Sequence, residues 1–154
     1  MAVTEAGLST LGITFGYAVG STKPDSFTQL ERIVSIGEAA VENETIDVSC
    51  LEDLVSKFVR GRGTVTDTLP VVVNFTDEVE AQWDAVLTAY SGRTAGQTCW
   101  FEVIVPNKTK AAFFKAAPPT KLPIPTMEQN GSFQATINLT VEELVGWETK
   151  VAFS

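Results

Sequence analysis

Large apolar and small or polar residues alternate over several short stretches of this chain, as they do in β-strands that bury one face. Between residues 11 and 20 every second residue is large and apolar, and the positions between them hold Gly, Thr and Ala. Residues 45–50 and 131–140 show the same two-residue period, and residues 98–105 are apolar at nearly every position. The patterns predict a mainly β domain in which residues 98–105 form a central strand.

Shorter patterns add further elements to this expectation. Strands are expected over residues 28–36, 64–76 and 111–117, and residues 51–59 are expected to form a short helical turn. The sequence Arg60-Gly61-Arg62-Gly63 is expected to lack regular structure, because glycine loses more conformational freedom in a strand than other residues do.

One segment, residues 76–91, has the period of an amphipathic helix instead. Its apolar face is formed by Val79, Trp83, Val86, Leu87 and Tyr90. Thr76 is placed to cap the first turn, and Gly92 is placed for a left-handed stop. A helix with a Trp and a Tyr on one face requires a broad apolar partner, so the predicted fold is α+β: an antiparallel β-sandwich or split barrel with one flanking helix.

The 154 residues are expected to form a single domain with three appendages. These are an N-terminal arm over residues 1–10, a long inter-strand loop over residues 37–63 and a C-terminal arm over residues 141–154. The C-terminal arm is unusually apolar, with Trp147 and Phe153 among its side chains. It either folds back on its own domain or docks on a neighbouring molecule.

Charge and composition narrow the function. The net charge of −8 argues against a surface that grips nucleic acid or an anionic membrane, since both require clustered Lys and Arg. The stretch Met1 to Ala6 lacks the basic and apolar regions of a signal peptide, so export by that route is not expected.

The sequence contains few residues that could catalyse a reaction or bind a metal ion. There is no histidine, which removes histidine-based triads and proton shuttles. Cys50 and Cys99 are expected to be buried free thiols, with a disulfide as the alternative, and two distant cysteines do not make a metal site. Adjacent acids such as Glu52 and Asp53 are typical of solvated turns. We therefore expect no enzyme activity, no cofactor and no metal.

The segment from Leu30 to Asp53 resembles the tail tube proteins, or major tail proteins, of long-tailed bacteriophages. The resemblance lies in a strand ending Ile33-Val34-Ser35-Ile36-Gly37-Glu38, an acidic turn, and then Thr45-Ile46-Asp47-Val48-Ser49-Cys50-Leu51-Glu52-Asp53. The later order of elements also agrees, from a Gly-rich loop to Gly63 through one helix and a strong strand at Trp100-Phe101.

The resemblance implies a structural subunit whose copies form hexameric rings, and rings that stack into a hollow tube through which DNA passes into the host. The same fold is shared by the tubes of contractile injection systems. The implied partners are the chain itself, a tape-measure protein and tail-terminator or tip proteins, with DNA present only in passage and no membrane. The implied location is the virion tail, preceded by the host cytoplasm during assembly.

Residue roles follow from the same resemblance. Contacts between subunits or rings are expected at Asp53, Lys57, Arg60, Arg62, Trp147 and Phe153. Candidates for lining the lumen are Asp47, Glu102, Gln134, Thr136 and Asn138, which are uncharged or acidic and would not hold phosphate groups.

A monomeric β-sandwich that binds carbohydrate is the alternative. It would require an exposed aromatic platform, and the only tryptophans available are Trp83, Trp100 and Trp147. The periodicity places Trp83 and Trp100 in the core, which weakens this alternative.

Overall fold

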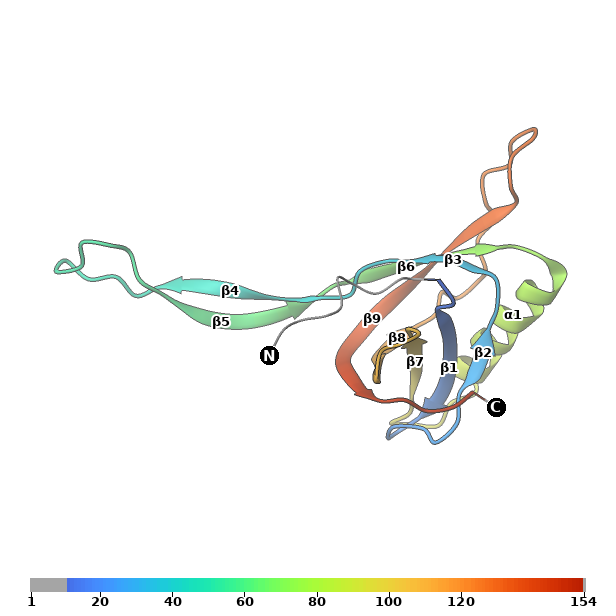
Figure 1. Ribbon diagram of the computed structural model, residues 1–154, viewed down its shortest axis with the longest axis horizontal. Coiled ribbons are helices and arrows are strands. Elements are labelled where there is room, and N and C mark those ends of the chain that lie inside the picture. Colours follow the sequence, from blue (N-terminus) through green and yellow to red (C-terminus); the bar gives the residue numbers. More distant parts are fainter. Residues whose placement is uncertain (1–10, 154) are drawn as a thin grey trace.

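A computed structural model describes residues 11–153 of the chain (Figure 1). In chain order its elements are β1 (Thr14–Gly20), β2 (Thr28–Leu30), β3 (Ile33–Ile36), β4 (Val41–Asp47), β5 (Phe58–Val65), β6 (Thr68–Asn74), α1 (Asp77–Ser91), β7 (Thr98–Ile104), β8 (Lys110–Ala117) and β9 (Gln134–Thr149). The prediction of a mainly β domain with one helix is confirmed.

Seven of the strands form one antiparallel sheet in the order β2-β1-β7-β8-β9-β6-β3. The long strand β9 joins the two halves of the sheet, because Gln134 to Thr140 pair with β6 whereas Thr140 to Thr149 pair with β8. Two register shifts interrupt the β8–β9 pairing, and Gly146 in β9 has a φ of 102°, which favours glycine. The sheet curls into two layers without closing into a barrel.

The main core lies between these layers and is covered by α1. The ring of Phe15 stacks on those of Phe101 and Phe114, with centroids 5.4 and 6.3 Å away, and the Trp83 ring of α1 lies 6.5 Å from Phe15. Trp83 has no exposed surface. The predicted core position of Trp83 is therefore confirmed.

The helix α1 begins and ends where the sequence predicts, but the conformation of its last turn differs from the prediction. The Thr76 hydroxyl oxygen accepts a hydrogen bond from the backbone N–H of Val79 at 3.4 Å, as the capping pattern predicts. The expected left-handed stop at Gly92 is wrong, since its φ is −88°. Its N–H donates to the Thr88 carbonyl at 3.0 Å, so the last turn closes in an ordinary backbone conformation.

A second, smaller core lies on the opposite face of β1, β7 and β8. Phe27 and Phe113 are fully buried there beside Trp100, which confirms the predicted burial of Trp100. The chain end closes this core, because Phe153 makes a bridge to Phe27 and lies directly over Gly16. The small residues of the first strand thus make room for a neighbouring segment.

The C-terminal segment folds back on its own domain. Residues 141–149 are not an arm, because they complete β9, and Val151 and Phe153 pack in the second core. The expected arm over residues 141–154 is corrected on this point: an apolar chain end here reflects burial within the subunit.

Residues 28–36 form two strands and not one. Between β2 and β3 the chain turns sharply at Arg32, whose φ is 59°, and the N–H of Glu31 donates to Oε1 of Gln82 in α1 at 2.9 Å. The turn places β2 and β3 at the two edges of the sheet although they are neighbours in sequence.

The segment between β3 and β6 is a two-stranded hairpin that projects from the body of the domain (Figure 1). Strands β4 and β5 pair from Val41 opposite Val65 to Asp47 opposite Phe58. The expected helical turn at residues 51–59 is wrong, and so is the expected irregularity at Arg60 to Gly63, which lie within β5. Cross-strand pairing compensates for the low strand propensity of the two glycines.

Candidate functional site

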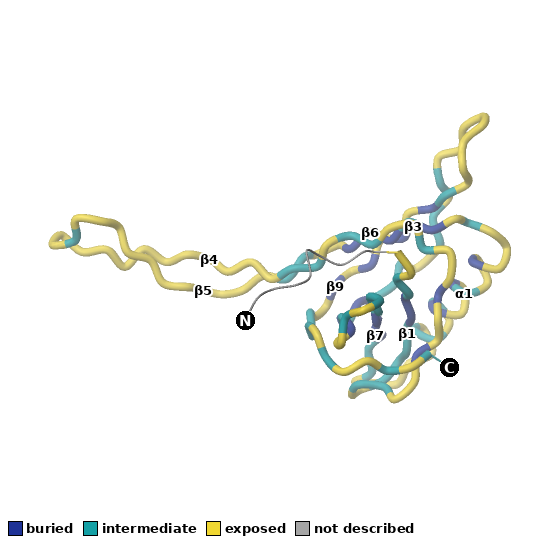
Figure 2. Tube along the Cα trace, in the orientation of Figure 1, coloured by how far each residue is buried: buried dark blue, intermediate teal, exposed yellow. Residues whose placement is uncertain are grey.

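The projecting hairpin is exposed over nearly all of its length. Every residue of β4 is exposed, and only two of the eight positions of β5 are partly covered (Figure 2). An isolated two-stranded ribbon is marginal in water without a packed face. The exposure indicates a surface that is completed by another molecule.

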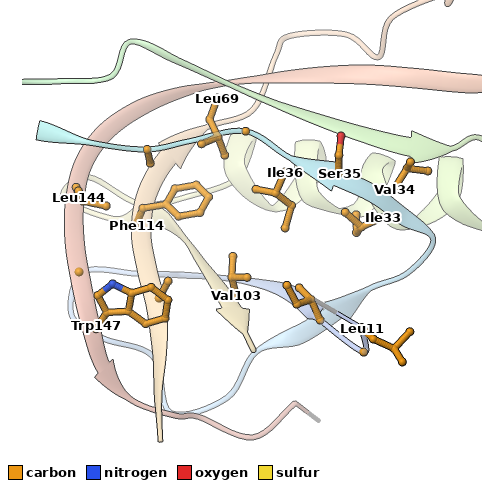
Figure 3. A pocket seen from close by; sticks show the side chains of 16 residues that line it. Leu11, Ile33, Val34, Ser35, Ile36, Leu69, Val103, Phe114, Leu144 and Trp147 are labelled. Atoms are coloured by element: carbon orange, nitrogen blue, oxygen red, sulfur yellow. The ribbon is translucent and has the colours of Figure 1, made fainter. Parts of the chain in front are cut away.

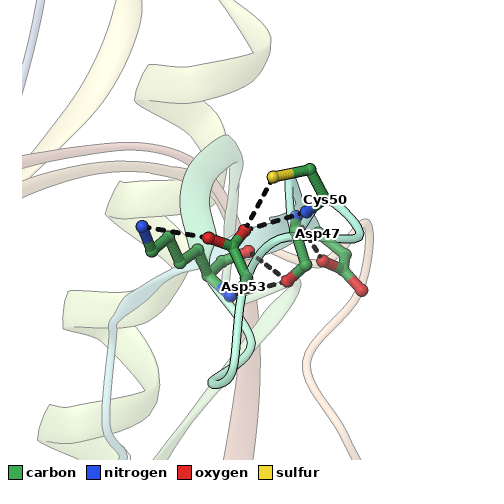
Figure 4. A network of polar contacts seen from close by, with 5 residues as sticks. Asp47, Cys50 and Asp53 are labelled. Carbon is green, nitrogen blue, oxygen red and sulfur yellow. Dashed lines mark hydrogen bonds and ion pairs between the residues drawn. The ribbon is translucent and has the colours of Figure 1, made fainter.

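The end of the hairpin, residues 47–57 (the hairpin tip), is held by side-chain hydrogen bonds (Figure 4). One carboxylate oxygen of Asp53 accepts from the backbone N–H of Cys50 at 2.8 Å, and the other lies 3.1 Å from Nζ of Lys57. Asp47 accepts from the N–H of Ser49 at 2.8 Å. These backbone hydrogen bonds are the largest cause that keeps the pKa of Asp47 and Asp53 below the ordinary range.

The same network presents apolar side chains to solvent. Leu51 and Leu54 are as exposed as in an extended chain, at 106% and 101%, and Val55 is 77% exposed. Cys50 is also exposed, so its expected burial is wrong, whereas the expected burial of Cys99 is confirmed. The structure keeps both as free thiols.

The predicted contact residues divide between the hairpin and the body. Asp53 and Lys57 form the ion pair of the hairpin tip, and Arg60 and Arg62 occupy exposed positions along β5. Trp147 lies on the body at the end of β9, half exposed, with Nζ of Lys108 4.4 Å from its ring centroid. Phe153 is partly buried in the second core and is therefore an internal contact.

Trp147 borders an apolar groove with a volume of about 890 Å³ (Figure 3). The groove lies where the curled sheet fails to close, between β3 on one side and β7, β8 and β9 on the other. Its walls include Leu11, Ile33, Ile36, Val103, Phe114 and Leu144. Sequence reasoning missed the groove, because its residues come from six separate segments and read individually as core.

The lumen candidates on β9 form an uncharged polar face. Thr136 and Asn138 are exposed, and Nε2 of Gln134 donates to Oδ1 of Asn74 on β6 at 3.1 Å. Across from them β6 presents Pro70 and Val72, paired with Asn138 and Thr136. The outward side of the β6–β9 pair, from Thr68 opposite Thr140 to Asn74 opposite Gln134, thus contains no charged side chain.

The two acidic lumen candidates lie elsewhere. Asp47 is the last residue of β4, at the hairpin tip, and lies opposite Phe58 of β5. Glu102 has no exposed surface, because the C-terminal segment covers it and the N–H of Val151 donates to its Oε2 at 2.8 Å. Burial raises the pKa of Glu102 above the ordinary value, against smaller lowering effects from Val151, Lys23 and Lys150. Glu102 is therefore corrected from a lumen residue to an internal one.

The described residues contain neither a group of side chains arranged to bind a metal ion nor a helix that could span a membrane. Between residues 11 and 153 no group of three or more Cys, Asp or Glu side chains is arranged to hold a metal ion. No helix in that range is long and apolar enough to cross a membrane.

Comparison with known proteins decides the family. The family model described as phage tail tube protein matches residues 3–148 of the chain. The chain belongs to the phage tail tube protein family. As a member of that family it is a structural subunit of a phage tail tube and not an enzyme.

Solved structures agree with the fold of this tail tube protein. It superimposes on a chain of the virion of a native gene transfer agent particle with a TM-score of 0.61 and 14% identity, covering 93% of this chain and 100% of the other. A chain from the tail of an empty gene transfer agent particle, refined with C6 symmetry, gives 0.58 and 13%, with 90% and 95% covered. A chain from the baseplate of the anti-feeding prophage gives 0.53 and 12%, with 94% and 95% covered. No curated protein sequence matches this tail tube protein.

Proposed function

We propose that six copies of this tail tube protein form a ring, and that rings stack into a hollow tube through which DNA passes during ejection into the host. The observation that carries the proposal is the uncharged outer face of the β6–β9 pair. The chain has a net charge of −8, yet this face presents Thr, Asn, Gln, Pro and Val. A wall of this kind neither holds phosphates as Lys and Arg do nor repels them as carboxylates do.

The open edges of the sheet support ring formation. Strands β2 and β3 stand at the two ends of the strand order, and unpaired edges favour strand pairing with another chain. Closed point-group symmetry uses one such contact repeatedly around an axis. The C6 symmetry of the gene transfer agent tail, whose chain shares this fold, is consistent with a ring of six.

A tube of defined length requires other proteins that set its length and close its ends. A tape-measure protein inside the tube during assembly, and terminator and tip proteins at its ends, would complete the tail. Subunits would be made and assembled in the host cytoplasm and would then remain in the virion. Between residues 11 and 153 two of the three tryptophans are buried, which leaves only Trp147 among them for the aromatic platform that carbohydrate binding would require.

Positive charge introduced on the proposed lumen wall tests the function. Virions assembled with Thr136→Lys and Asn138→Lys are expected to form tubes but to eject DNA more slowly, with the delay shrinking as salt rises. The matched control is Thr126→Lys with Gln129→Lys, two exposed positions in the loop before β9. Unchanged ejection by the first variant, or equal delay in both, would contradict the proposal.

A further inference from the structure

The loop of residues 118–133, which extends away from the body between β8 and β9, contains an asparagine followed by a glycine (Figure 1). Five asparagines lie along the chain, and Asn130 alone precedes a glycine, Gly131, while the other four precede Glu, Phe, Lys and Leu. Asparagine is one of the thermolabile residues. The backbone nitrogen that follows it can attack its side-chain amide carbon, and a glycine at that place has no Cβ to hinder the attack.

The structure places this pair in an exposed turn. The N–H of Gly131 donates to the carbonyl oxygen of Glu128 at 3.4 Å, which closes a turn around Gln129 and Asn130. This distance exceeds the usual range for such a bond, so the Gly131 nitrogen is held weakly. Asn130 and Gly131 are both exposed, and a Cβ built at Gly131 would meet no atom closer than 3.6 Å outside its chain neighbours. Solvent therefore has open access to the amide nitrogen and the side chain.

Another asparagine in the same conformation provides an internal comparison. Asn130 has a φ of 66°, in the left-handed region where residues other than glycine are disfavoured. Asn107 is also exposed, also lies in a turn and has a φ of 67°. The residue after it is Lys108, whose Cβ hinders an approach by the backbone nitrogen. The two sites thus share exposure and backbone conformation and differ in the residue that supplies the nitrogen.

We infer that Asn130 is a site of spontaneous deamidation. The backbone nitrogen of Gly131 bonds to Cγ of Asn130, and the bond from Cγ to Nδ2 breaks. The proton of the Gly131 N–H passes through solvent to the leaving nitrogen, which departs as ammonia. One water then opens the cyclic succinimide at either of its two carbonyl groups. Opening at one gives an ordinary aspartate, and opening at the other gives isoaspartate, in which the main chain passes through the former side chain.

The modification lies close to a contact at the start of β9. The carbonyl oxygen of Phe133 accepts a 2.9 Å hydrogen bond from the N–H of Phe75, and the two ring centroids are 5.9 Å apart. Isoaspartate adds one carbon to the main chain between Glu128 and this contact. The longer chain shifts Phe133 relative to Phe75 and weakens the hydrogen bond. Both products also add one negative charge to a chain whose net charge is already −8.

Peptide mapping of the aged full chain tests the site. After incubation in warm, mildly alkaline buffer, the peptide containing Asn130 should show the mass gain of an amide-to-acid change. An isoaspartate-specific methyltransferase with its methyl donor should label the same peptide. The peptide containing Asn107 should remain unmodified over the time in which most of Asn130 is converted.

Two matched variants test the role of the following residue. Gly131→Ala should lose most of the modification at Asn130, and its fold should survive because a Cβ there meets no close atom. Lys108→Gly should do the reverse and create a second site at Asn107, an exposed turn position where the side chain of residue 108 is not required for the fold. Circular dichroism of both variants checks that the domain is folded.

Amide hydrogen exchange tests the structural consequence. Exchange at Phe75 should be faster in aged protein than in fresh protein, because its acceptor on Phe133 has shifted. Asn130→Asp supplies the negative charge without the extra main-chain carbon, so exchange at Phe75 in N130D should match that of fresh wild type. Equal acceleration in N130D and in aged protein would overturn the effect assigned to the longer main chain.

Three other results would overturn the deamidation site itself. One is an Asn130 that keeps its amide in the folded chain while a synthetic peptide of residues 126–134 is converted, which would show that the turn protects it. Another is equal modification of Asn130 and Asn107. The third is an unchanged rate in G131A. None of these results depends on whether the chain forms rings, so they leave the proposed tube function to its own test.

Discussion

The backbone N–H of Val151 donates a 2.8 Å hydrogen bond to Oε2 of Glu102, a carboxyl group with no exposed surface. This bond attaches the last residues of the chain to the central strand β7. Oε1 of the same group is buried without a hydrogen-bond partner among the described residues. A buried acid with one free oxygen is costly to ionise.

Glu102→Gln should therefore change the pH dependence of stability. Burial raises the folded-state pKa of Glu102, so its stabilising contribution is complete below the ordinary value of 4.5 and is lost as pH rises through the raised value. The variant should unfold like wild type near pH 4 and be more stable than wild type near pH 8, measured by urea denaturation. Glu128→Gln, at an exposed loop position, should show no such divergence. Parallel pH profiles for E102Q and wild type would refute this role.

Gly16→Ala tests the packing of the chain end. A Cβ at residue 16 would overlap the ring of Phe153 and would lie 2.9 Å from the backbone carbonyl oxygen of Thr28, so both groups must move away. Overpacking of this kind destabilises by about 1–3 kcal/mol, and the free energy of unfolding should fall by about that amount. Gly131→Ala, where the nearest atoms are 3.6 Å away or more, should have a much smaller effect. In a Phe153→Ala background the same G16A change should cost less than in wild type, which would identify the ring as one source of the clash; an equal cost in both backgrounds would contradict it.

Asp53→Asn should loosen the hairpin tip without unfolding the domain. The carboxylate accepts from Cys50 and pairs with Lys57, and the neutral amide weakens both interactions. Amide hydrogen exchange at Cys50 should accelerate, while exchange in β7 should stay unchanged. Because the pKa of Asp53 is lowered, wild type should keep this protection in full above the ordinary pKa of 3.8 and lose it as pH falls through the lowered folded-state pKa. Unaltered exchange in D53N would mean that the carboxylate does not order the tip.

The two thiols should differ sharply in reactivity. Cys50 is exposed, whereas burial raises the pKa of Cys99 to about 12, which leaves almost no thiolate at neutral pH. A thiol-specific chromophoric reagent should label one group per native chain and a second only after unfolding. In Cys50→Ser native labelling should disappear. Rapid labelling of two groups in the native protein would contradict the burial of Cys99.

Sequence patterns predicted the elements whose burial is set locally. The helix face of Val79, Trp83 and Val86 is buried as its period predicts, and the strand around Trp100 and Phe101 is central. In these segments one face packs against the core over the whole length of the element, so the periodicity of the sequence predicts which residues are buried.

The hairpin and the chain end could not be predicted in the same way. Leu51 and Leu54 have helical spacing, but no core lies beneath them, so the pattern there reflects a surface and not a buried face. Phe133 shares the apolar positions of the 131–140 alternation with Ala135, yet it precedes β9 and is half exposed, with its ring centroid 5.9 Å from that of Phe75. The burial of Glu102 depends on Val151 approaching from 49 residues away, a contact that no local pattern records.

The groove and the uncharged face depend on the sheet topology. Ile36 and Trp147 border one groove only because the curled sheet leaves a gap between β3 and the β9 end. The alternation of residues 131–140 places Thr136 and Asn138 on one polar face, but only the strand register identifies the uncharged residues of β6 beside them.

The most direct test of the account is electron cryo-microscopy of the concentrated protein, with a tail-tip complex added as initiator. If the chain assembles as proposed, the images will show stacked six-fold rings around an open channel, with Gln134, Thr136 and Asn138 on the channel wall. Protein that stays monomeric under all conditions, or tubes in which the β6–β9 face lies on the outside, would contradict it.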